Sequence, residues 1–163
     1  LAIVLMGVID VERAYEAIDW QIIFLLAGVI PLGHALEKTG GVLFVAENLT
    51  MWLGDYGPLA LLAGIYLVTT VMTDMISNQA TAILLTPIAL GAAATIGADP
   101  RVFAMAIAFA ASASFATPVG YQTNTLIYGA GDYRFTDFIK VGLPLNLIFW
   151  GVAVFYLPSF WPF

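Results

Sequence analysis

The sequence predicts an all-α integral membrane protein, and three observations support this fold class. Of its 163 residues, 61% are hydrophobic and only 10% are charged, far from the composition of soluble globular proteins. The mean hydropathy is +0.95. The apolar residues also form runs close to the length that a helix needs to cross about 30 Å of hydrocarbon. These runs cover residues 20–35, 58–73, 80–97, 102–116 and 138–157.

The composition also excludes several kinds of site and partner. Without cysteine there are no disulfides or thiolate metal sites, and a single histidine argues against a zinc or haem centre. The net charge is −6 and the chain has no basic patch, so no nucleic-acid partner is expected. Because Leu1 already lies in an apolar stretch with no initiator methionine, the chain is expected to be a fragment of a longer protein.

The first two elements are predicted on either side of a helix-stop sequence at residues 38–41. A transmembrane helix is expected at 20–36, with a kink near Pro31. Residues 42–54 are too few to span the bilayer, but their apolar side chains share one helix face and their polar side chains the other. This segment therefore predicts a helix lying in the membrane interface, with Trp52 at headgroup level.

Two apolar segments then follow within residues 58–97, joined by Asp-Met-Ile-Ser-Asn-Gln at 74–79. This joint has no glycine, proline or basic residue, which makes it a poor surface turn. A re-entrant hairpin with its tip at 77–79 explains it, because non-helical backbone is tolerated at membrane depth where it lines a cavity. The residue pattern alone fits a polar turn between two spanning helices equally well.

A broken helix is predicted at 101–130, and a final transmembrane helix at 137–158. The break is indicated by Pro118 and Gly120, which precede a polar run at 121–125. Before the break, small residues recur every fourth position and predict a face for close helix packing. They are Ala104, Ala108, Ser112 and Ala116.

The two polar interruptions, at 77–79 and 117–125, are expected to meet near the middle of the bilayer. Helix ends in lipid leave carbonyl and N–H groups unpaired, so they are admitted where ions or substrate groups complete them. Carbonyl, hydroxyl and amide oxygens suit a hard cation such as sodium, whereas a helix N-terminus offers N–H donors to an anion. One such site can hold both, which is typical of secondary transporters.

Four motifs resemble the second repeat of the divalent anion/sodium symporter family, and the match covers nearly the whole chain. They are Thr-Asp-Met-Ile-Ser-Asn-Gln-Ala-Thr-Ala at 73–82, Thr-Pro-Ile at 86–88, Ala-Thr-Pro at 116–118 and Tyr-Gly-Ala-Gly at 128–131. The resemblance implies that residues 1–163 form the C-terminal membrane repeat, one inverted-repeat half of a secondary transporter.

The resemblance also implies two sets of site residues. Sodium, the coupling ion, would be held by Thr73, Ser77, Asn78 and the backbone of Ala116. No other cofactor is expected. The anion would face Ser77, Asn78, Gln79 and Thr117, and we add Thr123 and Asn124 from the polar run, although such side chains also bind neighbouring helices.

The resemblance leaves the anion open between sulfate and a small di- or tricarboxylate. The chain has Gln79 where the family signature has threonine, while residues 120–125 look more like the sulfate-permease branch. The expected function is sodium-coupled symport, in which no covalent bond is made or broken. The expected location is the cell (inner) membrane, as a multi-pass protein. The family also implies a homodimer of the full-length protein.

Other functions are compatible with parts of the pattern. An arsenite exporter or a sodium/proton antiporter would have a similar architecture, and a non-transporting membrane subunit would not need the two polar breaks. An intramembrane enzyme using Asp74 or His34 lacks a paired acid or an activated nucleophile. We instead expect Asp74 to orient backbone N–H groups beside the site.

Overall fold

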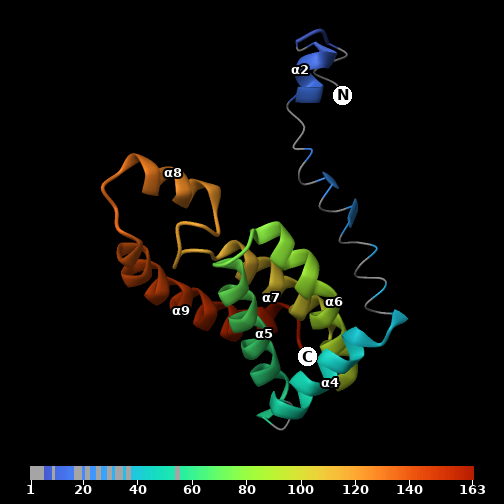
Figure 1. Ribbon diagram of the computed structural model, residues 1–163. Coiled ribbons are helices and arrows are strands. Elements are labelled where there is room, and N and C mark those ends of the chain that lie inside the picture. Colours follow the sequence, from blue (N-terminus) through green and yellow to red (C-terminus); the bar gives the residue numbers. More distant parts are fainter. Residues whose placement is uncertain are drawn as a thin grey trace.

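The computed structural model describes residues 6–8, 10–16, 20, 23–24, 27–28, 31, 35, 38–53 and 56–163. Within these ranges the regular structure is entirely helical, which confirms the all-α prediction (Figure 1). The predicted transmembrane helix at 20–36 lies mostly outside the described residues, and His34 lies outside them. The helices are α2 (Val11–Glu16), α4 (Gly41–Leu53), α5 (Pro58–Thr73), α6 (Asn78–Ile96), α7 (Pro100–Ser112), α8 (Gln122–Ala130) and α9 (Phe135–Phe160).

Local signals explain where several helices begin and end. Helix α5 begins with Pro58, whose missing N–H is no loss in a first turn. The hydroxyl of Ser77 accepts a hydrogen bond from the N–H of Ala80 at 3.3 Å and caps α6. Helix α6 ends at Gly97, which has the left-handed φ of 70° that favours glycine.

The chain turns between α5 and α6 at residues 74–77, slightly before the predicted tip at 77–79. Asn78 and Gln79 already belong to the first turn of α6, because serine at position 77 is a strong helix cap. Helices α6 and α9 are each long and apolar enough to cross a membrane. The placement of 58–97 as a re-entrant hairpin within the bilayer stays a prediction.

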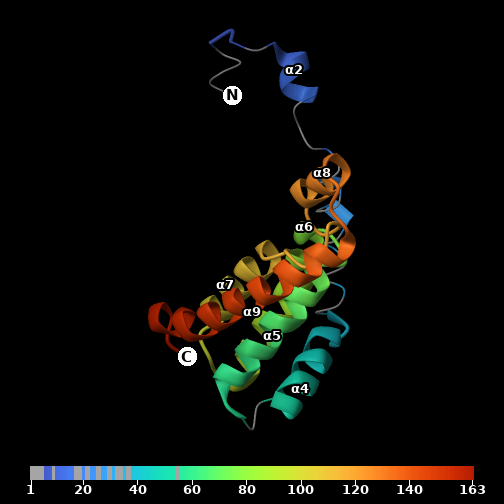
Figure 2. The same cartoon turned by 90° about the vertical axis from the view of Figure 1, so that its left-hand side faces the viewer.

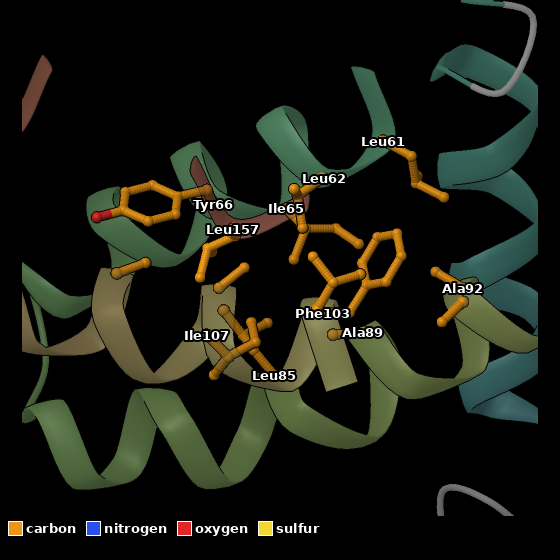
Figure 3. Close-up of a cluster of buried hydrophobic side chains, with 14 residues drawn as sticks. Leu61, Leu62, Ile65, Tyr66, Leu85, Ala89, Ala92, Phe103, Ile107 and Leu157 are labelled. Atoms are coloured by element: carbon orange, nitrogen blue, oxygen red, sulfur yellow. The ribbon is translucent and has the colours of Figure 1, made fainter. Parts of the chain in front are cut away.

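Helices α5, α6 and α7 pack against one another, α4 covers α6, and α9 crosses α5 and α7 (Figures 1 and 2). Their shared core joins large side chains such as Leu62, Tyr66 and Phe103 to small ones such as Ala89, all fully buried (Figure 3). Alternating large and small residues let the helices approach closely in an apolar environment. This core holds the ends of α5 and α7 in fixed positions.

The packed face of α7 differs from the predicted one. Phe103, Ala106, Ile107 and Ala110 are buried, whereas Ala108 and Ser112 of the small-residue stripe are exposed. Within the described residues the stripe is thus not the packed face of α7, and packing of these two residues against another part of the longer protein stays a prediction. The physical reason is that α5 and α6 cover the side of α7 that offers the most apolar surface, and that side carries Phe103 and Ile107.

Residues 113–121 separate α7 from α8, so the predicted segment 101–130 is helical on both sides of a break. Helix α8 has no buried residue and lies at the opposite end of the bundle from α4 (Figures 1 and 2). Helix α9 then runs for 26 residues and continues through Pro144. The non-helical break thus lies between two helical segments, beside the turn that joins α5 to α6.

Candidate functional site

The turn at 74–77 and the break at 113–121 lie directly against each other. Gly120 shows how close they are: a Cβ atom at this position would collide with the carbonyl oxygen of Thr73 and the hydroxyl of Ser114. Only glycine leaves this space free without a shift of the neighbouring backbone. The fold therefore brings together the two polar interruptions predicted at 77–79 and 117–125.

Three oxygen atoms converge at the ends of α5 and α7. The Oγ1 atom of Thr73 lies 2.8 Å from Oδ1 of Asn78 and 2.8 Å from the carbonyl oxygen of Ala111. The Ala111 carbonyl belongs to the last turn of α7, where helix carbonyls have no helical partner and carry partial negative charge. Because the Thr73 hydroxyl has one proton, it can donate to only one of the two acceptors at a time. The arrangement is rich in electron pairs and short of donors.

Asp74 joins the turn to the break and to α9. Its Oδ1 atom accepts hydrogen bonds from the Ser114 hydroxyl at 3.1 Å and from the Ala116 N–H at 3.3 Å. Its Oδ2 atom accepts one from the Asn146 amide at 2.9 Å. The side chain of Asp74 thus orients a backbone N–H group beside the site, as predicted, and it is itself buried.

Polar side chains supply hydrogen bonds for the non-helical backbone of the break. The Thr117 hydroxyl donates to the carbonyl of Asp74 at 2.6 Å. The Asn124 amide donates to the carbonyls of Ser114 at 2.8 Å and of Thr117 at 3.2 Å, and the Thr125 hydroxyl donates to that of Pro118 at 2.6 Å. Such bonds make a broken helix tolerable at membrane depth.

A polar cavity of about 270 Å³ opens between the turn and the break. Of the six predicted anion-facing residues, Ser77 and Gln79 line it, whereas Asn78, Thr117 and Asn124 make the hydrogen bonds given above and are not part of its lining. Thr123 is exposed on α8. The full lining is Met75, Ile76, Ser77, Gln79, Val119, Gly120, Tyr121, Gln122 and Thr125, with no charged side chain among them.

Two helices begin at this cavity. Helix α6 starts after Ser77, and α8 starts after Tyr121, whose side chain makes no capping hydrogen bond. First-turn N–H groups have no partner within their own helix, so both helices direct donors and a positive dipole end to the same region. The cavity therefore suits an anionic group, and the oxygen cluster of Thr73, Asn78 and Ala111 suits a cation.

Sequence reasoning missed further residues of this region, among them Ala111, Ser114, Gln122 and Asn146. The sequence could have indicated Asn146, because it is a polar residue inside the apolar run at 138–157. Gln122 was part of the polar run at 121–125 but was not assigned to the site. Ala111 left no signal, because only its backbone takes part and the position of a carbonyl depends on where the helix ends.

Comparison with known proteins places the chain in a family. A family model described as citrate transporter matches residues 1–108. An uncharacterized transporter of Escherichia coli is 45% identical over 100% of this chain and 27% of its own length. An uncharacterized transporter of Synechocystis sp. is 46% identical over 91% of this chain and 24% of its own length.

Sodium/sulfate cotransporter 1 of Chlamydomonas reinhardtii is 32% identical over 94% of this chain and 18% of its own length. The chain thus spans about a quarter of the length of the first curated relatives that it matches. These relatives agree with the resemblance seen in the motifs. The chain belongs to the citrate transporter family and forms part of a multi-pass membrane protein.

Proposed function

We propose that the full-length protein is a sodium-coupled symporter of a divalent anion, either sulfate or a small di- or tricarboxylate, and that this chain supplies half of its site. The observation that carries the proposal is the oxygen cluster of Thr73, Asn78 and Ala111 next to an uncharged polar cavity. The names of the family and of the sodium/sulfate cotransporter support the same two classes of anion.

Sodium fits the oxygen cluster by the chemistry of its donors. A hard cation prefers hydroxyl, amide and carbonyl oxygens, and a cation there would be bound by lone pairs of the Thr73 hydroxyl, the Asn78 amide oxygen and the Ala111 carbonyl, with the hydroxyl proton turned away from it. The negative end of α7 favours the same charge. We propose that Thr73 and Asn78 bind sodium, together with Ser77 and the backbone of Ala116, as expected from the sequence. The Ala111 carbonyl is an additional ligand.

The anion fits the cavity because its lining offers donors and no acidic side chain. Ser77, Gln79 and Gln122 bring hydroxyl and amide groups, and the N-termini of α6 and α8 add backbone donors. No lysine or arginine is present to balance a dianion, so the bound sodium would supply the opposite charge. Coupling then follows, since the anion binds well only when sodium is already in place.

The remaining parts of the proposal concern the whole protein. It would act without making or breaking a covalent bond, in the cell (inner) membrane, and as the homodimer that the family resemblance implies. The second half of the site would come from an inverted repeat on another part of the longer chain.

Asn78→Ala tests the proposal in the full-length protein reconstituted in liposomes. Uptake of labelled sulfate, succinate and citrate is measured with an inward sodium gradient and with potassium in its place. We expect sodium to stimulate wild-type uptake of at least one of the three anions. Asn78→Ala removes one oxygen of the cluster, so stimulated uptake should fall at least about tenfold, the effect of losing roughly 1.4 kcal/mol of binding.

Asn48→Ala is the matched control for this variant. Asn48 lies exposed on α4, and its amide donates to the Phe44 carbonyl of the same helix at 2.7 Å. Its uptake should equal that of the wild type. Equal sodium stimulation in wild type and Asn78→Ala would remove Asn78 from the site, and wild-type uptake that ignores sodium would contradict the symport mechanism.

A further inference from the structure

Helix α9 carries a buried amide inside an otherwise apolar stretch. Asn146 is 5% exposed, and its Nδ2 atom donates to Oδ2 of Asp74 at 2.9 Å, across 72 positions of the sequence. Its Oδ1 atom is buried and has no hydrogen-bond partner among the described residues. A buried polar atom without a partner destabilises a protein, so leucine would be the more favourable residue for packing alone. The amide therefore calls for an explanation beyond packing.

One turn earlier on the same face of α9, Gly142 allows the break to approach closely. A Cβ atom at position 142 would collide with the carbonyl group of Phe115 and the Cα atom of Ala116. Asn146 acts on the same segment through Asp74, whose other carboxylate oxygen accepts the N–H of Ala116 and the hydroxyl of Ser114. Shape and hydrogen bonding on this face of α9 thus serve the same short stretch of backbone.

We propose that Asn146 is a positioning residue for the transport site. It fixes the carboxylate of Asp74, and this carboxylate fixes residues 114–116 relative to the turn that carries Ser77 and Asn78. The last helix thereby sets the distance between the two halves of the cavity. This inference rests on the proposed function, because it assigns Asn146 a role in the same site.

The effect of losing this contact follows from the precision that a binding site needs. A binding site keeps its function when its groups are held within about 0.5 Å of the productive geometry by the residues that support them. Asn146→Leu leaves Oδ2 of Asp74 without its donor, so the turn and the break lose the contact that holds them to α9. Affinity should suffer more than turnover, since the site is displaced and none of its own groups is removed.

A reciprocal exchange separates positioning from general damage to the fold. Asn146→Asp alone places two carboxylates face to face, which is unfavourable. When it is combined with Asp74→Asn, the new amide at position 74 accepts from Ser114 and Ala116 through its oxygen and donates to the new carboxylate at position 146. Every hydrogen bond of the original arrangement is then kept, with the direction of one reversed.

The experiment uses the full-length protein in liposomes and compares the wild type, Asn146→Leu, Asn146→Asp and the double exchange. KM and maximal rate are measured for labelled sulfate, succinate or citrate, whichever the wild type carries, at saturating sodium. We expect Asn146→Leu to raise KM at least about tenfold with less than about threefold change in maximal rate per folded protein. Asn48→Leu, the matched control on α4, should leave both constants unchanged.

The double exchange should restore KM to within about threefold of the wild type, while Asn146→Asp alone should not. A wild-type KM in Asn146→Leu, or a double exchange no better than Asn146→Asp, would overturn the proposal. If Asn146→Leu yields no folded protein, the comparison of Asn146→Asp with the double exchange tests the proposal instead. Sodium-independent uptake by the wild type would contradict only the coupling mechanism, because KM for the anion still reports on positioning.

Discussion

At the scale of single residues, the site depends on groups that are shared between neighbours. Thr73 has one hydroxyl proton for two oxygen atoms at 2.8 Å, and Ser114 has one for the Thr73 carbonyl and the Asp74 carboxylate. Thr73 can donate to only one of its two acceptors at a time, so the other lacks this donor, whereas Oδ1 of Asp74 also accepts the Ala116 N–H. An oxygen without a donor favours a cation, and this is why Thr73 is the residue whose removal should affect sodium most directly.

Thr73→Val should raise the sodium concentration for half-maximal uptake at least about tenfold, because valine keeps the branched shape and removes one oxygen ligand. Thr73→Ser keeps the oxygen and should stay close to the wild type. Thr95→Val is the control, since the Thr95 hydroxyl is exposed and donates to the Gly91 carbonyl of its own helix at 3.0 Å. An unchanged sodium dependence in Thr73→Val would show that this hydroxyl binds no sodium.

At the scale of elements, the meeting of the turn with the break decides the geometry of the site. Gly120 and Gly142 bring the break against α5 on one side and against α9 on the other, and a side chain at either position would collide with backbone. The hydrogen bonds of Asp74 and Thr117 then fix the contact. The break thus has a defined structure, and its shape depends on its contacts with α5 and α9.

Gly120→Ala should lower the stability of the full-length protein by about 1–3 kcal/mol, the usual effect of overpacking a close contact. The readout is the midpoint of thermal unfolding in detergent micelles. Gly129→Ala is the matched control: a Cβ atom there meets nothing within 4 Å, and alanine in a helix is favoured over glycine by up to about 1 kcal/mol. If both variants unfold at the same temperature, the turn and the break are not in contact.

At the scale of the whole molecule, the described residues form a helical unit with a partly open polar cavity and large exposed apolar surfaces. On α9 alone, Val141, Ile148, Phe155 and Tyr156 are exposed. Lipid or other helices of the longer protein would cover such surfaces. Ser77 is exposed at the cavity in this chain. In the full-length protein with substrate bound, it would face the other half of the site rather than open water.

Cysteine labelling tests this arrangement, since the chain has no cysteine of its own. In a full-length protein freed of other cysteines, Val119→Cys, at an exposed position of the cavity lining, should react with a water-soluble maleimide without substrate, and sodium plus the transported anion should slow the reaction at least about tenfold. Trp52→Cys, at an exposed position of α4, serves as the control and should react equally in both conditions. Equal reaction of Val119→Cys with and without substrate would place this cavity outside the site.

The sequence by itself determined the class of the protein and the position of its irregular segments. Composition and apolar run length predicted membrane helices, and Pro118 with Gly120 predicted the break that the structure has at 113–121. The polar joint at 74–79 between two apolar segments located the turn to within a few residues. These features are local, because helix length, capping and chain breaks depend on neighbouring residues in the sequence.

Only the tertiary structure decided which groups meet. It paired Thr73 with the carbonyl of Ala111, placed Asn146 on Asp74, and turned the Asn124 amide toward the backbone of the break. It also buried a different face of α7 from the one that the small residues predicted. The physical reason is that contacts between distant segments depend on how helices pack in space, and neither apolar periodicity nor composition contains that information.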